Sequence, residues 1–261
     1  MKYNLIEARE KGYDTLLTFG GAYSNHIYAV AAAGENFDFD TIGVIRGEPY
    51  EKLNPTLSFA KARGMRLHYL SRKDYQQKYS AENIKNLEKS YGSFYMLPEG
   101  GTNNLAVKGC SEIIDEIDQP FDYITSSCGT GGTLAGIIAG LNGESKVIGF
   151  SALKGGVFFL DDIKQHIYNY KKRIYSNWHI ETEFHFGGYA RHSSELIKFI
   201  NTFKREHNIP LDPIYTGKML FGLFEKVKNG HFKPNTSILA IHTGGLQGIS
   251  GFNIRFGDLI K

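Results

Sequence analysis

Short apolar segments of the kind that form buried strands alternate along this chain with longer segments whose apolar residues recur every three or four positions. The short segments predict strands at residues 15–19, 41–45, 66–70, 93–97, 121–126, 146–152 and 237–241. The longer segments predict helices at residues 25–33, 55–63, 81–91, 105–117, 131–141, 157–174, 193–207 and 218–229. Regular alternation of strands and helices indicates parallel sheets that are covered by helices.

A segment rich in turn-forming residues, PEGGTNN at 98–104, interrupts this alternation. We therefore predict a small α/β domain at residues 8–100 and a large α/β domain at residues 101–261, which residues 1–7 join. The expected fold is α/β, with two open, twisted, mostly parallel sheets flanked by helices. Gly34 and Gly64 follow predicted helices directly and are expected to end them.

Composition narrows the class of protein. The 261 residues are 41% apolar and 22% charged, which suits a globular protein with substantial cores, and the net charge of +3 is too small to indicate a nucleic-acid partner. No apolar run approaches the length of a membrane span, and the only cysteines, Cys110 and Cys128, form no disulfide framework. We expect a soluble cytoplasmic protein with no membrane partner. The histidines form no ligand motif, so we also expect no metal.

Two glycine-rich segments, GGAYSNH at 20–26 and SCGTGGT at 127–133, each follow a predicted strand and open a predicted helix. A helix N-terminus presents backbone N–H groups and the positive end of a dipole to an anion. In the second segment the glycines allow the backbone to curl around a phosphate, and the threonines add hydroxyl donors. Tight packing of a helix on a sheet is the structural alternative for these glycines.

Two common phosphate-binding motifs do not fit the second segment. The dinucleotide fingerprint GxGxxG would need a glycine where Leu134 stands, and no acidic residue ends the following strand. The P-loop pattern GxxxxGK[ST] does not occur. Two further segments, DPIYTGK at 212–218 and HTGG at 242–245, also lie at strand–helix junctions. Because α/β proteins bind ligands at the carboxyl ends of their strands, we expect these loops to converge on one crevice.

The set GGAYSNHIYAVAAAG, LPEGGTN, SSCGTGGTLAG, LDPIYTGK and IHTGG resembles the pyridoxal-phosphate family that contains 1-aminocyclopropane-1-carboxylate (ACC) deaminase and D-cysteine desulfhydrase. The motifs follow the family order over essentially the whole chain. The resemblance implies a fold like that of the tryptophan synthase β subunit, with pyridoxal 5′-phosphate as cofactor. It also implies a small amino-acid substrate and a homodimer.

The resemblance assigns binding roles position by position. Ser24, Asn25 and His26 would bind the substrate carboxylate at a helix N-terminus, and Asn25 would also hydrogen-bond the 3′-oxygen of the cofactor. Ser24 would in addition be catalytic, by shuttling protons. The cofactor phosphate would be held by Gly129, Thr130, Gly131, Gly132 and Thr133.

The resemblance also assigns the residues around the cofactor ring. Tyr189 and Tyr215 would be the catalytic tyrosines, whose phenols suit proton transfer. Thr216 and Thr243 would lie beside the pyridine nitrogen, or else cap the turns that follow them. ACC deaminases typically carry glutamate at the position of Thr216, whereas the desulfhydrases carry threonine. A hydroxyl beside the nitrogen gives a weaker electron sink, adequate for β-elimination of a thiolate.

We therefore expect elimination from D-cysteine, which gives pyruvate, ammonia and sulfide. ACC deamination is the alternative, and a non-catalytic binder of an amino acid or phosphate metabolite is the alternative of another class. Family members hold the cofactor as a Schiff base on the lysine of a Gly-Asn-Lys motif, and the family spacing places that motif a few residues before Met1. The segment that begins at Lys2, KYNL, resembles the continuation of that helix rather than the motif. We expect an N-terminally truncated chain without turnover, or a pseudoenzyme.

Overall fold

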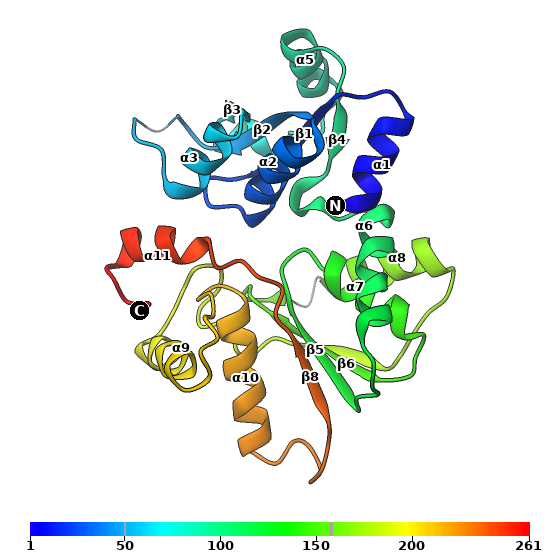
Figure 1. Ribbon diagram of the computed structural model, residues 1–261, viewed down its shortest axis with the longest axis vertical. Helices are drawn as coiled ribbons and strands as arrows, with labels where there is room; N and C mark the ends of the chain where they lie inside the picture. The colour runs from blue at the N-terminus through cyan, green and yellow to red at the C-terminus, as the bar shows by residue number, and fades with distance from the viewer. Residues whose placement is uncertain (50, 157–158) are drawn as a thin grey trace. The chain divides into compact units, whose positions relative to one another are not determined.

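The computed structural model describes residues 1–49, 51–156 and 159–261. The chain divides into two compact units, Met1–Thr102 and Asn103–Lys261. Each unit is built on its own four-stranded sheet, and all strand pairs in both sheets are parallel (Figure 1). This arrangement confirms the predicted α/β fold with two open parallel sheets flanked by helices.

The first unit has the strand order β3-β2-β1-β4. Apolar side chains of α1, α2 and α3 form one core on one face of the sheet, and those of α4 and α5 form a second core on the other face. Strand β1 contributes to both, because Leu16 faces the first core while Leu17 and Phe19 face the second. The elements are α1 (Lys2–Glu10), β1 (Thr15–Gly21), α2 (Asn25–Phe37), β2 (Asp40–Arg46), α3 (Pro55–Ala62), β3 (Arg66–Leu70), α4 (Arg72–Gln76), α5 (Ala81–Tyr91), β4 (Tyr95–Leu97) and the 3-10 helix η1 (Glu99–Gly101).

The second unit has the strand order β7-β6-β5-β8. Helices α6, α7 and α8 share one core with β5 and β6, while α9, α10 and α11 share another core with β6. Figure 1 shows α7 and α10 on opposite sides of this sheet. The elements are α6 (Asn104–Ser111), the 3-10 helix η2 (Glu112–Glu116), β5 (Tyr123–Cys128), α7 (Gly132–Leu141), β6 (Lys146–Ser151), α8 (Phe159–Lys171), β7 (Trp178–Glu181), α9 (Ser194–His207), α10 (Thr216–Lys228), β8 (Ile238–Ile241) and α11 (Gly248–Phe256).

Each sheet has one point at which the strand order reverses. In the first unit this switch point lies between β1 and β4, and in the second it lies between β5 and β8. Ligands of open α/β sheets bind outside the carboxyl ends of the strands at such points. The glycine-rich segments after β1 and β5 and the HTGG segment after β8 therefore all leave a sheet at a switch point.

Several predicted boundaries need correction. The helix expected at 25–33 continues through Gly34 to Phe37. A Cβ atom on Gly34 would lie 2.4 Å from the Thr41 Cγ2 atom and 2.8 Å from the Phe39 carbonyl oxygen, so this glycine permits close packing of α2 on the sheet. The residue that ends the helix is Asp38, with a left-handed φ of 56°.

Other differences concern short elements. The helix expected at 105–117 is α6 followed by η2, and the helix expected at 157–174 is α8, for which residues 157 and 158 lie outside the described part of the chain. Helices α4 and α11 and strand β7 lack a counterpart among the predicted elements. By contrast, β3 and α5 have the predicted bounds.

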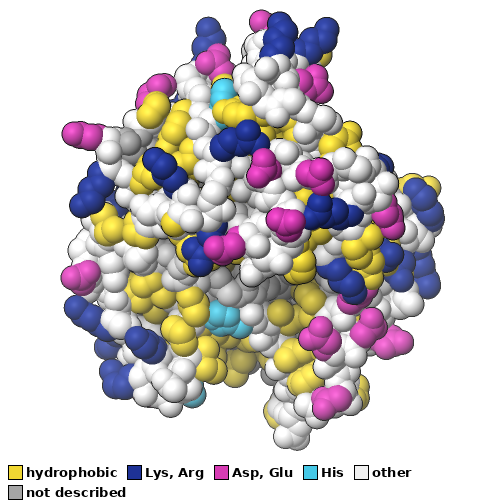
Figure 2. Space-filling model, turned by 45° about the horizontal axis from the view of Figure 1, so that its top comes forward, with side chains coloured by type: hydrophobic (Ala, Val, Ile, Leu, Met, Phe, Trp, Pro, Cys, Tyr) yellow, Lys and Arg dark blue, Asp and Glu magenta, His cyan; other side chains and the backbone are white. Residues whose placement is uncertain are grey.

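The two units meet in sequence between Thr102 and Asn103, inside the turn-rich segment. Residues 1–7 group with the first unit rather than with the second, because Leu5 and Ala8 belong to the core beneath α2 and α3. Acidic and basic side chains are interspersed over the face shown in Figure 2, as expected for a net charge of +3. Among the described residues, no helix is long and apolar enough to cross a membrane.

Candidate functional site

The loop from β1 to α2 places three predicted site residues at a helix N-terminus. Ser24 is the N-cap, and its Oγ accepts a hydrogen bond from the Ile27 amide at 3.3 Å. Asn25 and His26 are the first two residues of α2, where backbone N–H groups lack partners within the helix. A Cβ atom on Gly20 would lie 2.8 Å from the Ser24 Oγ, so the glycine allows this tight turn. The geometry suits a carboxylate.

The His26 imidazole is anchored to the sheet. The Thr18 Oγ1 lies 2.8 Å from the His26 Nε2 and also donates a hydrogen bond to the Leu97 carbonyl at 3.1 Å. Burial lowers the pKa of His26 to about 4. The ring is therefore neutral at pH 7 and cannot pair as a cation with an anionic substrate.

The turn after β4 packs against the same imidazole. A Cβ atom on Gly101, whose φ is +70°, would lie 2.7 Å from the His26 Cε1 atom. This turn is held from the other side, because the Glu99 carboxylate accepts a hydrogen bond from the Tyr75 hydroxyl at 3.0 Å and pairs with Lys78 at 3.1 Å. The loops after β1 and β4 thus meet at His26, at the switch point of the first sheet.

In the second unit, the loop from β5 opens α7 through glycine. Gly131 is the N-cap with a φ of +85° and has no side chain to occupy the first-turn amides, and Gly132 begins the helix, whose first turn contains no acidic residue. A Cβ atom on Gly131 would lie 2.6 Å from the Ile163 side chain, so packing also requires a glycine. Both interpretations of these glycines, anion binding and tight packing, are compatible with the structure.

Cys128 ends β5 directly before this loop. Its side chain is buried, and burial raises the pKa of the thiol to about 12, although a hydrogen bond from the Gly131 amide acts in the opposite direction. The thiol is therefore a packed, protonated group rather than a nucleophile.

Tyr215 lies beside the same loop. A Cβ atom on Gly129 would be 3.2 Å from the Tyr215 Cε1 atom, so the predicted phosphate loop and the predicted catalytic tyrosine are in contact. Tyr215 is the N-cap of α10. Burial, followed by the nearby Tyr189 and Asp212, raises the pKa of Tyr215 above its ordinary value, so the phenol keeps its proton.

Asp212 holds the start of α10 in place. Its Oδ2 accepts hydrogen bonds from the amides of Ile214 and Tyr215 at 2.8 and 2.9 Å. Its Oδ1 accepts from the amide and the hydroxyl of Thr216 at 2.7 and 2.8 Å. Burial raises the pKa of this carboxyl, while these four donors favour the ionised form. The carboxylate fixes the backbone on which the Tyr215 ring is mounted.

The two predicted ring-nitrogen threonines differ in their surroundings. Thr216 has no exposed surface, and its hydroxyl donates to Asp212 while accepting from the Asp212 amide at 3.1 Å. This is the capping arrangement considered as its alternative. Thr243 is exposed and is the second residue of the HTGG segment, and its Oγ1 lies 3.5 Å from the Ser127 Oγ. Thr243 and Ser127 therefore link the segment after β8 to the end of β5.

Tyr189 completes the set in the second unit. It is 47% exposed, and its ring meets that of Tyr215 edge to face, with centroids 6.2 Å apart and an interplanar angle of 69°. The structure thus brings Tyr189, Tyr215 and the 129–133 loop together within one unit.

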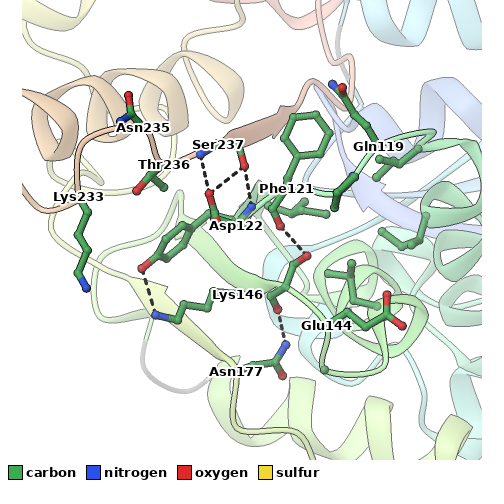
Figure 3. A pocket seen from close by; sticks show the side chains of 18 of the residues that line it. Gln119, Phe121, Asp122, Glu144, Lys146, Asn177, Lys233, Asn235, Thr236 and Ser237 are labelled. Carbon is green, nitrogen blue, oxygen red and sulfur yellow. Dashed lines mark hydrogen bonds between the residues drawn. The ribbon is translucent and has the colours of Figure 1, made fainter.

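A large cavity lies at the opposite edge of the second sheet. It has a volume of about 1240 Å³ and is lined by the amino ends of β5 and β6 (Figure 3). Several of its polar side chains pair with one another: Asp122 accepts from the amide and hydroxyl of Ser237 at 2.8 and 2.9 Å, and Lys146 lies 3.4 Å from the Tyr123 hydroxyl. Because this edge is away from the switch point, we do not assign the candidate site to it.

Sequence reasoning did not single out three residues that organise the site. Thr18 orients His26, Asp212 fixes the start of α10, and Lys218 is a buried charge in the first turn of that helix. The available signals were a threonine inside the apolar strand segment TLLTF and two charges that bracket Tyr215 in DPIYTGK. Their partners depend on tertiary contacts, which spacing alone does not reveal.

Two parallel sheets with glycine-rich helix starts at their switch points are typical of two-sheet α/β proteins that bind an anionic ligand. Residues 1–244 match the family described as pyridoxal-phosphate dependent enzyme, and the chain belongs to this family. The cofactor and the fold, which is like that of the tryptophan synthase β subunit, are thereby confirmed.

The names of the relatives include both of the activities that the sequence predicts as alternatives. The bifunctional D-cysteine desulfhydrase/1-aminocyclopropane-1-carboxylate deaminase of Arabidopsis thaliana, a mitochondrial protein, is 29% identical over 273 residues, which cover 95% of this chain and 68% of the plant protein. The 1-aminocyclopropane-1-carboxylate deaminase of Variovorax paradoxus is 25% identical over 289 residues, which cover 98% of this chain and 83% of the bacterial protein. The crystal structure of an ACC deaminase homologue matches with a TM-score of 0.84 at 27% identity, over 99% of this chain and 82% of that one.

The residues present fit the cofactor phosphate. The start of α7 combines an N-cap without a side chain, a first turn without acidic residues and the loop threonines Thr130 and Thr133. A dianionic group placed there would meet backbone amides, hydroxyls and the positive end of the helix dipole.

Proposed function

We propose that this protein is a deaminating lyase that eliminates sulfide from D-cysteine, with pyruvate and ammonia as the other products. The observation that carries the proposal is the Asp212–Thr216 clamp, because it leaves a hydroxyl-lined rather than a carboxylate-lined site at the second switch point. The name of the bifunctional plant relative includes both D-cysteine desulfhydrase and 1-aminocyclopropane-1-carboxylate deaminase. ACC deamination is therefore the second candidate.

The phosphate-binding role goes to Gly129, Thr130, Gly131, Gly132 and Thr133. The Gly131 amide already hydrogen-bonds the Cys128 thiol. The Thr133 hydroxyl is hydrogen-bonded to the Cys110 thiol in the same way. We therefore assign the direct phosphate contacts chiefly to the amides of Gly132 and Thr133 and to the Thr130 hydroxyl. Bound pyridoxal phosphate would supply the electron sink that lets the substrate lose its β-substituent and its α-proton, and the lysine of the family's Gly-Asn-Lys motif would accept that proton.

The substrate carboxylate is assigned to the start of α2. Because the His26 Nε2 is committed to Thr18 and the ring is neutral, the backbone amides at Asn25 and His26 bind the carboxylate, and the imidazole shapes the pocket. Ser24 keeps its hydroxyl proton free to donate, because its Oγ accepts from Ile27. The Asn25 side chain is assigned to the 3′-oxygen of the cofactor. That these groups and the 129–133 loop serve one crevice stays a prediction.

The tyrosines are assigned to the leaving group. Since the pKa of Tyr215 is raised, its phenol donates a hydrogen bond to the departing sulfur rather than taking a proton from the substrate. Tyr189 is more exposed than Tyr215 and lies edge-on to it. We assign Tyr189 as the second hydrogen-bond donor of the pair, on the side of Tyr215 that faces solvent.

The ring nitrogen is assigned to Thr243, with Ser127 behind it. Thr216 is left out of this role because its hydroxyl is buried against Asp212. A neutral hydroxyl does not hold a proton on the nitrogen as a carboxylate does. The resulting weaker sink suffices for expulsion of a thiolate, but it suits the opening of a cyclopropane without an α-hydrogen less well.

The experiment compares products. In a form of the enzyme that carries the Schiff-base lysine of the family, with pyridoxal phosphate present, sulfide and pyruvate from D-cysteine should exceed 2-oxobutyrate from ACC by about tenfold or more, a difference of about 1.4 kcal/mol in barrier. The reverse ratio would select ACC deamination. Tyr215→Phe is the control, because it should lower elimination without weakening cofactor binding.

Turnover in this experiment depends on the lysine of the Gly-Asn-Lys motif, which holds the cofactor as a Schiff base in the family. No such motif stands at the family spacing before Ser24 within these 261 residues. We therefore expect the 261-residue polypeptide to bind the cofactor reversibly, without a borohydride-reducible absorbance band and without turnover. A stable, reducible band would overturn this expectation, and reversible binding without activity in any longer product of the gene would favour the non-catalytic binder. A homodimer and a cytoplasmic location stay predictions.

A further inference from the structure

Lys218 is a buried cation that the proposed chemistry does not use. It is the third residue of α10, and only 2% of its surface is exposed. An ammonium group taken out of water destabilises a fold strongly unless hydrogen bonds compensate. Burial also lowers the pKa of Lys218 to about 8, while Asp212 acts in the opposite direction. We therefore examine which groups hold the Lys218 ammonium in this buried position.

The hydrogen bonds of Lys218 go to one short turn. Its Nζ donates to the His185 carbonyl at 2.9 Å and to the Gly188 carbonyl at 2.8 Å. The same two carbonyls accept from the Gly188 and Arg191 amides at 3.0 and 3.1 Å. The ammonium therefore binds both ends of the segment at residues 185–188.

This turn needs an external anchor. Phe186 and Ala190 have φ values of 53° and 55°, and Gly187 and Gly188 have φ values of 92° and 116°. Left-handed backbone is unfavourable for residues other than glycine because the Cβ atom comes too close to the backbone. Residues 186–190 include two such residues, and a segment of this kind persists only where surrounding contacts hold it.

The residue that follows the turn is Tyr189. Its ring lies edge-on to Tyr215, which is the N-cap of the helix that carries Lys218. The start of α10 therefore carries two groups. Tyr215 is its N-cap, and three residues later the Lys218 ammonium hydrogen-bonds the segment that precedes Tyr189.

We propose that Lys218 is a positioning residue that sets Tyr189 against Tyr215 by holding the carbonyls of His185 and Gly188. Its meaning for catalysis rests on the proposed function, in which the two tyrosines form the donor pair at the leaving group. The contacts among Lys218, residues 185–188, Tyr189 and Tyr215 all lie within the second unit, so this part of the proposal does not depend on the proposed function.

The test uses the unliganded full chain labelled with 3-fluorotyrosine, with the signals of Tyr189 and Tyr215 assigned from the two Tyr→Phe variants. In Lys218→Met we expect both fluorine signals to shift and the cross-ring nuclear Overhauser effect to disappear, while urea unfolding remains cooperative. The matched control is Lys226→Met, which removes a mostly buried lysine of the same helix that pairs with Glu181 instead. It should leave both tyrosine signals in place.

Lys218→Gln is the second variant, because its amide is one bond shorter and cannot replace the ammonium at both carbonyls. Unchanged tyrosine signals and a retained cross-ring effect in either folded variant would overturn the proposal. Failure of both variants to fold would also overturn it, because Lys218 would then be a residue of the folding core and not a positioning residue.

Kinetics separate this proposal from the proposed function. In an active form of the enzyme, Lys218→Met should lower kcat by about tenfold, as expected for a misplaced proton donor, with much less change in KM. If the fluorine signals move but no form of the enzyme acts on D-cysteine, the positioning role holds and the proposed activity fails.

Discussion

The Thr18 hydroxyl lies between the His26 Nε2 and the Leu97 carbonyl, at 2.8 and 3.1 Å. A carbonyl oxygen has no proton to give, so the single hydroxyl proton of Thr18 goes to Leu97. Thr18 must then accept from His26, which fixes the imidazole as the Nε2–H tautomer with its lone pair on Nδ1. One threonine therefore ties β1, β4 and the start of α2 together and determines the hydrogen-bonding character of His26.

Thr18→Val should release this tautomer. The imidazole loses its acceptor and the Leu97 carbonyl loses a donor, so we expect a loss of about 1–3 kcal/mol in the free energy of unfolding. Nitrogen-15 shifts of His26, which should show a protonated Nε2 and an unprotonated Nδ1 in the parent, should move toward the average of the two tautomers.

Thr41→Val is the matched control for that experiment. Thr41 is 2% exposed in the same sheet, and its Oγ1 has no hydrogen-bond partner. Replacing that hydroxyl by a methyl group should leave the unfolding free energy unchanged or raise it. Equal losses in both valine variants would show that the Thr18 hydroxyl has no special role.

The neutral state of His26 predicts a pH dependence of stability. Its pKa is about 4 in the folded protein and about 6.5 in the unfolded chain, so the unfolded state binds more protons between these values. The contribution of His26 is therefore present above pH 6.5 and is lost as the pH falls toward 4. From pH 6.5 to 5 we expect a loss on the order of 1–2 kcal/mol. Urea titrations should show this loss in the parent and a smaller one in His26→Asn.

The elements that could be predicted are those whose sequence signal lies within the element itself or in the residues that flank it. Strand β3 and helix α5 have the predicted bounds, because each is defined by its own apolar pattern and flanking turn residues. Helix α4 spans five residues and buries only Tyr75, too little for a period to appear. Gly34 gave a helix-end signal that was wrong, because close contact with Thr41, not left-handed backbone, requires the glycine.

The same distinction applies to the candidate site. The loops after β1, β5 and β8 could be located from glycine and hydroxyl residues that follow apolar strands. The roles of Thr18 and Lys218 could not, because their partners Leu97 and His185 are 79 and 33 positions away in the chain. The sequence pattern thus predicts which loops form the candidate site. Tertiary contacts determine how the side chains of those loops are held.

Gly131→Ala should damage both packing and cofactor binding. The new methyl group meets Ile163 at 2.6 Å in a left-handed backbone with φ of +85°, directly at the proposed phosphate cradle. Gly143→Ala is the control beyond the other end of α7, since its φ is +96° but its nearest side-chain contact, Tyr175, lies at 3.8 Å. We expect pyridoxal-phosphate affinity to fall about tenfold in Gly131→Ala, as for a lost charge-assisted contact, and to be nearly unchanged in Gly143→Ala. Equal affinities in the two variants would place the phosphate elsewhere.

The buried ammonium of Lys218 predicts a gain in stability at high pH. Its pKa is about 8 in the folded protein and about 10.5 in the unfolded chain, so the unfolded state binds more protons across this window and stability rises with pH. The titratable groups that interact with it are Asp212, whose pKa is raised by burial, and His192, whose pKa is lowered by burial, and Lys218→Met is the reference that retains both of them. Between pH 8 and 10 the parent should therefore gain about 2 kcal/mol of unfolding free energy relative to Lys218→Met. Urea titrations at the two pH values measure this difference, and parallel curves for the two proteins would mean that the turn at residues 185–188 solvates the ammonium as well as water does.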